Sequence, residues 1–103
     1  MRLDADQIDT GLASLPGWSH DLDGKAIRRS FKFRDFGEAF GFMTQVALAA
    51  EKADHHPEWS NVWNRVDVAL TTHSDGGVTG KDFDLAKRID AIAARLALAA
   101  DGL

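Results

Sequence analysis

The spacing of apolar residues changes along this chain, and that change limits the possible folds more than any other feature. Ile27, Phe31 and Phe33 alternate with polar residues, the period of two of a half-buried strand. From Phe36 the apolar residues recur at the spacing of an amphipathic helix. A chain that carries both periods is expected to pack helices on a sheet.

The same succession of strand and helix returns in the second half of the chain. Residues 59–72 alternate apolar and polar side chains, and we predict a hairpin that turns near Asn64, because asparagine tolerates turn geometry. Thr79 then resembles a helix N-cap, with Asp82 at the third helical position. An apolar stripe continues from there nearly to the C-terminus.

Further signals complete the predicted order of elements. Residues 4–15 predict a short helix, and Asp23-Gly24 predicts a two-residue hairpin between a strand through Leu22 and the strand 27–34. A long helix is expected over 36–53, ending before Pro57. The order is α-β-β-α-β-β-α. We therefore predict an α+β fold in a single domain, residues 1–103: a four-stranded antiparallel sheet with two long helices packed on one face, plus the short N-terminal helix.

Composition excludes several kinds of site. The chain has no cysteine, which rules out disulfides, zinc–thiolate centres and thiol nucleophiles. A formal net charge of −4 argues against a nucleic-acid partner. A local basic cluster at Arg28, Arg29, Lys32 and Arg34 is interpreted as a solvated strand face. There is no apolar stretch of membrane-spanning length and no secretory signal, so we expect a cytoplasmic protein with no membrane partner.

Three of the four histidines, His55, His56 and His73, fall in one short span, and carboxylates such as Glu51 and Asp54 lie beside the adjacent pair. Histidine exchanges protons near neutral pH, and a nearby carboxylate can orient the ring or raise its pKa. Two other interpretations remain open from the residues alone. The pair could be a polar helix terminus, or the three rings could bind zinc, although adjacent histidines rarely reach one ion.

The same span resembles a known family. Residues 51–64, EKADHHPEWSNVWN, followed by LTTH at 70–73, are similar to the pterin-4a-carbinolamine dehydratases. The resemblance continues through Asp82 and covers most of the chain from Trp18 onward. It departs at Trp63, where the family commonly has tyrosine, and at Val78, where leucine is common.

The resemblance implies a hydro-lyase that removes water from a 4a-hydroxytetrahydropterin to give the quinonoid dihydropterin, in tetrahydrobiopterin recycling, with no metal and no cofactor. It also implies a homodimer or homotetramer. The family's active-site histidines fall on His55, His56 and His73. The residues expected to bind or border the substrate are Asp82, Trp59, Glu51 and Asp54.

The division of labour among the histidines stays open at this point. We predict that His55 and His73 form the main acid–base pair and that His56 assists. The alternative is a non-catalytic dimerisation module or transcriptional coactivator-type partner, since relatives can stabilise a dimeric regulator. The sequence leaves undecided the physiological pterin, the hydroxylase served, and the choice between dimer and tetramer.

Overall fold

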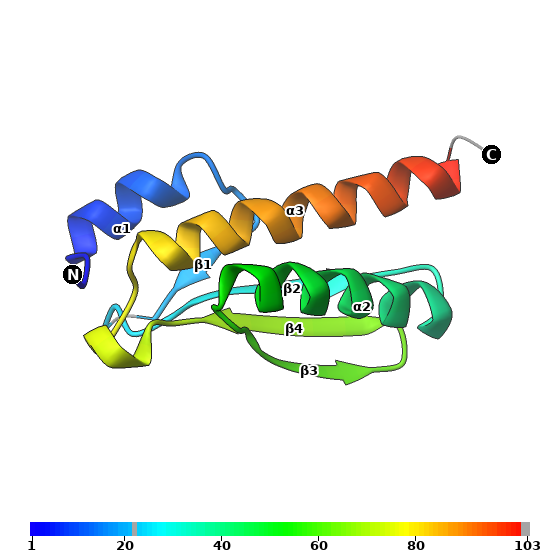
Figure 1. Ribbon diagram of the computed structural model, residues 1–103. Coiled ribbons are helices and arrows are strands. Elements are labelled where there is room, and N and C mark those ends of the chain that lie inside the picture. Colours follow the sequence, from blue (N-terminus) through cyan, green and yellow to red (C-terminus); the bar gives the residue numbers. More distant parts are fainter. Residues whose placement is uncertain (22, 102–103) are drawn as a thin grey trace.

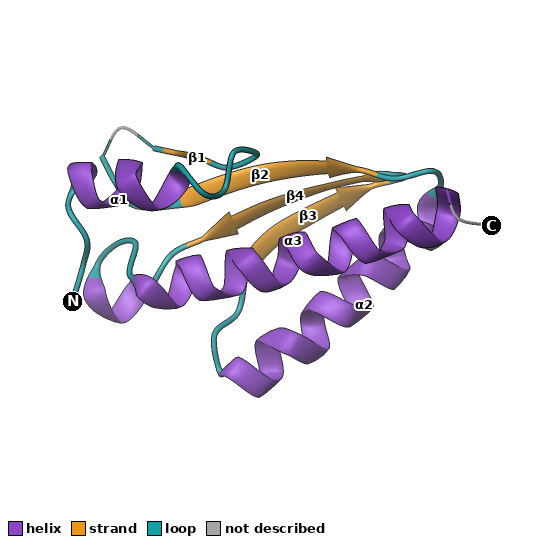
Figure 2. Cartoon of the chain, turned by 90° about the horizontal axis from the view of Figure 1, so that it is seen from above, coloured by secondary structure: helices purple, strands orange, loops and turns teal. Residues whose placement is uncertain are grey.

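The computed structural model describes residues 1–21 and 23–101, and a single antiparallel sheet with helices on one side forms its framework (Figures 1 and 2). The elements follow the order α-β-β-α-β-β-α that the sequence predicts, with one additional short 3-10 helix. They are α1 (Ala5–Leu12), β1 (Ser19–His20), β2 (Ile27–Lys32), α2 (Phe36–Ala53), β3 (Glu58–Val62), β4 (Arg65–Leu70), η1 (His73–Asp75) and α3 (Gly80–Asp101).

The sheet has the order β1-β2-β4-β3, and every neighbouring pair is antiparallel. Its register explains the alternation in the sequence. Phe31 pairs with Val66, and Trp59 pairs with Val68, so apolar side chains of three strands share one face. The other face carries exposed polar residues such as Arg28. The strand β2 accordingly alternates between residues that face the core and residues that face solvent.

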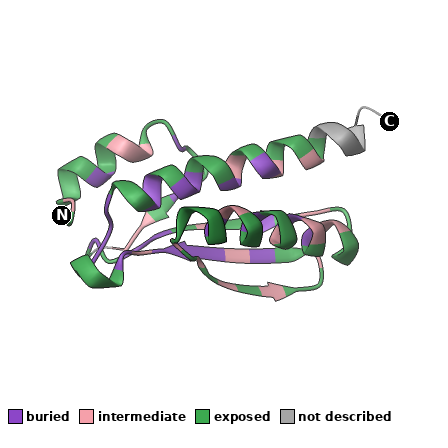
Figure 3. Ribbon diagram, in the orientation of Figure 1, coloured by how far each residue is buried: buried purple, intermediate pink, exposed green. Residues whose placement is uncertain are grey.

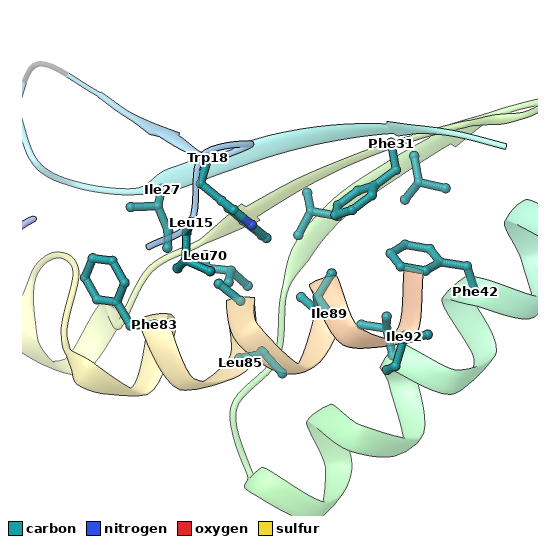
Figure 4. Close-up of a cluster of buried hydrophobic side chains, with 14 of the residues drawn as sticks. Leu15, Trp18, Ile27, Phe31, Phe42, Leu70, Phe83, Leu85, Ile89 and Ile92 are labelled. Atoms are coloured by element: carbon teal, nitrogen blue, oxygen red, sulfur yellow. The ribbon is translucent and has the colours of Figure 1, made fainter. Parts of the chain in front are cut away.

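Both long helices cover the apolar face, and the core lies between them and the sheet (Figures 3 and 4). Phe42 of α2 is fully buried, with its ring 4.9 Å from that of Phe31. Ile89 and Ile92 of α3 project toward the same cluster (Figure 4). Burial of these side chains removes apolar surface from water and fixes both helices on the sheet.

The predicted two-residue hairpin at Asp23-Gly24 is wrong. His20 pairs with Ile27, so the connection between β1 and β2 spans residues 21–26, of which Leu22 lies outside the described residues. Tertiary contacts favour the longer loop. The carbonyl of Asp23 accepts a hydrogen bond from the Arg2 side chain, and that of Gly24 accepts one from the Val78 amide.

The predicted hairpin near Asn64 is confirmed, but Asn64 is not the residue in the left-handed region. That residue is Trp63, with φ of 48°. Asn64 instead donates its side-chain amide to the carbonyl of Phe33, which fastens the turn to the end of β2. The left-handed conformation thus falls on Trp63, while Asn64 makes a contact far along the chain.

Arg29, the one charged residue on the inner face of β2, is accommodated by an acid on α3. Its guanidinium donates to Asp90 at 2.8 Å and lies 4.4 Å from the centre of the Phe31 ring. The Trp18 indole donates to the same Asp90 oxygen. Among the described residues, β1 pairs with β2 only at Ile27 and Arg28. The interpretation of the basic cluster as one solvated strand face is therefore wrong for Arg29, which lies on the inner face of β2.

His20 ties β1 to the first helix and supplies a testable pH dependence. Its Nε2 lies 2.7 Å from Asp9, and hydrogen bonds to Asp9 and to the Asp21 carbonyl raise the pKa of this imidazole. A raised pKa stabilises the fold below the pKa of the unfolded chain, and that contribution is lost as pH rises through the folded value. NMR titration should show a pKa above the ordinary value, which Asp9→Asn lowers. An unchanged pKa in Asp9→Asn would contradict the assignment.

Candidate active site

The candidate site forms at the end of the molecule where α2 ends, α3 begins and the chain leaves β4 (Figure 1). The first residue of β3 and the last of β4 share this end, because the two strands are antiparallel. Helix α2 ends at Ala53, and its C-cap Asp54, which has a left-handed backbone with φ of 52°, turns the chain sharply. This turn directs the two adjacent histidines away from the helix axis and toward the start of α3.

His55 is the most enclosed histidine, and its partner is a fully buried acid. Its Nε2 lies 2.6 Å from Asp82 Oδ1, with His55 12% and Asp82 0% exposed. The other carboxylate oxygen accepts hydrogen bonds from the Thr72 hydroxyl and the Thr79 amide. Thr79 caps α3 as predicted, since its hydroxyl accepts from the Lys81 amide. The start of α3 therefore holds Asp82 in place, and Asp82 in turn orients the His55 ring.

Each of the other two histidines also meets a carboxylate through Nε2. His56 pairs with Glu51 at 2.7 Å, and His73 pairs with Glu58 at 2.6 Å. Both pairs are exposed; the His73 side chain is 82% accessible. These surface contacts orient the rings but contribute little to stability.

All three rings pair with a carboxylate through Nε2, and this pairing determines which ring nitrogen carries the proton. An ionised carboxylate only accepts hydrogen bonds, so Nε2 must carry a proton in all three rings, and Nδ1 bears the lone pair of each neutral imidazole. Among the described residues, every buried polar side-chain atom has a hydrogen-bond partner. His55 Nδ1 makes no hydrogen bond there and is therefore accessible. A neutral ring can take a proton at Nδ1, and the imidazolium can return it.

A pocket of about 260 Å³ unites the three rings, and we call it the histidine pocket. It is lined by Asp54, His55, His56, Thr71, Thr72, His73, Ser74 and Lys81. The predicted histidines, separated by up to 18 residues in sequence, therefore face one space. The arrangement can donate and accept protons on a small ligand held between them.

The predicted substrate-binding residues occupy different places. Asp82 lies beneath the pocket, and Glu51 holds His56 from its outer side. Trp59 is partly buried against the core and lines a separate hollow on the sheet, not the histidine pocket. Asp54 borders the pocket, but its clearest structural part is the left-handed turn that ends α2.

The structure adds residues to the site that the sequence did not assign a part there, among them Glu58, Thr72 and Lys81. Glu58 faces His73 only because β3 and β4 are antiparallel neighbours. Thr72 reaches Asp82 across the loop that carries η1. The position of Glu58 at the start of a strand, just after the histidine pair, was the one signal that could have found it.

Substitutions at Asp54 can separate the role of its left-handed backbone from the role of its carboxylate side chain. Glycine adopts the left-handed region without strain, so Asp54→Gly should retain stability, whereas Asp54→Val should lose about 1–2 kcal/mol. Urea unfolding of both variants measures the difference. Equal stability of the two variants would contradict the assignment.

Within residues 1–21 and 23–101, no group of three or more histidine and acidic side chains is arranged to hold a metal ion. In the same part of the chain, no helix is both long and apolar enough to cross a membrane.

The fold and the pocket together define a class: an α+β protein with one antiparallel sheet and a pocket lined by three histidines at its end. The model of the family described as pterin 4 alpha carbinolamine dehydratase matches residues 1–92. The chain belongs to this family, and as the sequence predicts it is an enzyme of the hydro-lyase class.

Individual relatives are similar in sequence to this chain over nearly its whole length. A Bradyrhizobium protein named for this dehydratase is 62% identical over 93% of this chain and 97% of its own. A Chelativorans protein with the same name is 56% identical over 91% and 96%. A crystal structure described as a transcriptional coactivator/pterin dehydratase from Brucella melitensis has a TM-score of 0.87 at 54% identity, covering 90% of this chain and 99% of that one.

A more distant structure shares the fold alone. It is described as a pterin dehydratase-like protein that serves as a RuBisCO assembly factor in the alpha-carboxysome. Its TM-score is 0.65 at 19% identity, covering 75% of this chain and 89% of that one.

Proposed function

We propose that this chain dehydrates 4a-hydroxytetrahydropterin to the quinonoid dihydropterin through its three histidines. The observation that carries the proposal is the shared pocket in which each ring is held through Nε2 by a carboxylate. Hydroxide is a poor leaving group, so one imidazolium protonates the C4a hydroxyl, which departs as water. A neutral imidazole accepts the N5 proton while the C4a–N5 double bond forms.

His55 and His73 form the main acid–base pair in this proposal, and His56 assists. His55 is the best oriented ring, since the buried Asp82 fixes its Nε2. Asp82 also stabilises the imidazolium that forms on His55 during proton transfer. Asp54 borders the substrate and Glu51 acts by holding His56, while Trp59, outside the histidine pocket, makes no direct contact with the substrate. The chain acts as one domain, residues 1–103, in the cytoplasm, within tetrahydrobiopterin recycling.

Stopped-flow measurement of carbinolamine decay, with and without the protein, tests the activity. The protein should accelerate the decay, and a double variant, His55→Ala with His73→Ala, should abolish most of that acceleration. Unchanged catalysis in the double variant would refute the histidine assignment. No acceleration by the wild-type protein would refute the activity.

A homodimer or homotetramer is the expected assembly, and the outer face of α2 supports it. Phe36, Phe40 and Leu48 are exposed there although all three are large and apolar. The same face supports the second candidate, a coactivator-type binding module. Sedimentation of Phe40→Glu with Leu48→Glu should show a smaller assembly than wild type. A stable protein partner without any dehydration would favour the module.

A further inference from the structure

A second pocket, of about 530 Å³, lies beside the histidine pocket in the angle between α2 and α3. Figure 2 shows the two helices diverging toward the C-terminal end of α2 and the N-terminal half of α3. Ala49, Ala53 and Leu85 form an apolar part of its wall. His55 and Lys81 line both pockets, so the two spaces adjoin across these side chains.

The second pocket is surrounded by positive charge, and we call it the cationic pocket. Lys52, Lys81, Lys87 and Arg88 line it, opposed by Asp84 alone. These are four of the chain's 12 lysines and arginines, although the net charge of the chain is −4. Among the described residues, none of the four makes an ion pair within 4.0 Å. Their charges are therefore available to a ligand.

Local cations in a mainly acidic protein create a positive potential that attracts anions. Arg28, Arg29, Arg34 and Arg65, which lie outside this pocket, are by contrast each paired with an acid. The apolar wall argues against a pocket for a small hydrated anion alone. It favours a ligand that has a carbon skeleton and carries its charge at one end.

We propose that the cationic pocket receives an anionic group, a phosphate or carboxylate, carried on the side chain of the pterin substrate. This inference rests on the dehydratase function proposed above. The pterin ring occupies the histidine pocket, and its substituent passes His55 and Lys81 into the cationic pocket. The preferred substrates are accordingly pterins with a charged side chain rather than a neutral polyol.

The affinity for stable oxidised pterins tests this preference without requiring turnover. The probes are 6-hydroxymethylpterin and its phosphate ester, with Kd measured by pterin fluorescence at low salt. Wild type should bind the ester more tightly. The variant Lys87→Gln with Arg88→Gln should reduce the ratio of the two affinities by roughly three- to tenfold, since exposed ion pairs contribute modestly. The ratio should also fall as ionic strength rises.

Arg95→Gln is the matched control, because Arg95 is an exposed cation of the same helix outside the cationic pocket. It should leave the ratio unchanged. Equal affinity of wild type for the two probes overturns the inference, and intact dehydration then leaves the dehydratase proposal standing. Inorganic phosphate binding as tightly as the ester also overturns it, because the pocket would then serve a free anion. Failure to dehydrate any carbinolamine refutes the proposed function instead.

Discussion

Replacing His55 by glutamine is expected to lower kcat/KM for carbinolamine dehydration by about 10²–10⁴-fold, the usual loss on removal of a positioned acid–base group. Glutamine can still donate a hydrogen bond to Asp82, so the buried carboxylate keeps a partner. It cannot exchange a proton near neutral pH. The variant therefore removes the chemistry while preserving the local hydrogen bonding.

The measurement is stopped-flow kinetics, with circular dichroism and urea unfolding to verify the fold. His20→Gln is the matched control, because His20 lies outside the histidine pocket and pairs with Asp9 of α1. We expect it to retain full activity. If the His55→Gln enzyme were as active as the wild type, the main acid–base role would belong to His56 or His73 instead.

Replacing Asp82 by alanine is expected to destabilise the fold by about 3–5 kcal/mol, as when one partner of a buried polar pair is removed. The fully buried carboxylate accepts hydrogen bonds from Thr72, from the Thr79 amide and from His55. Alanine removes the acceptor of the Thr79 amide and of the His55 ring, which is thereby released, and leaves the Thr72 hydroxyl only the Thr79 hydroxyl as a partner. Activity should fall together with stability.

Asp82→Asn separates these two effects. Asparagine has nearly the same volume as aspartate, but its NH2 group would face a hydrogen-bond donor. An intermediate loss of stability is therefore expected. Asp84→Ala removes an exposed acid two positions further along the same helix and should change stability by less than about 0.5 kcal/mol. Urea unfolding of the three variants gives the comparison. Equal stability of Asp82→Ala and Asp84→Ala would contradict the buried network.

The large elements could be predicted from the sequence because their signals are local. The residues of β2 alternate between buried and exposed, and α2 begins at Phe36, directly after Asp35, whose side chain accepts from the Glu38 amide. The histidines could also be selected, since two are adjacent and the third follows a strand. Neither inference requires knowledge of distant contacts.

The sequence by itself determined the order of elements, the face of the sheet that is buried, and the choice of the three imidazoles as candidate reactive groups. Only the tertiary structure decided their partners. Asp82 reaches His55 because the start of α3 returns beneath the end of α2, and Glu58 reaches His73 because β3 lies against β4. Hydrogen bonds between residues 15 and 27 positions apart depend on packing, which no local pattern encodes.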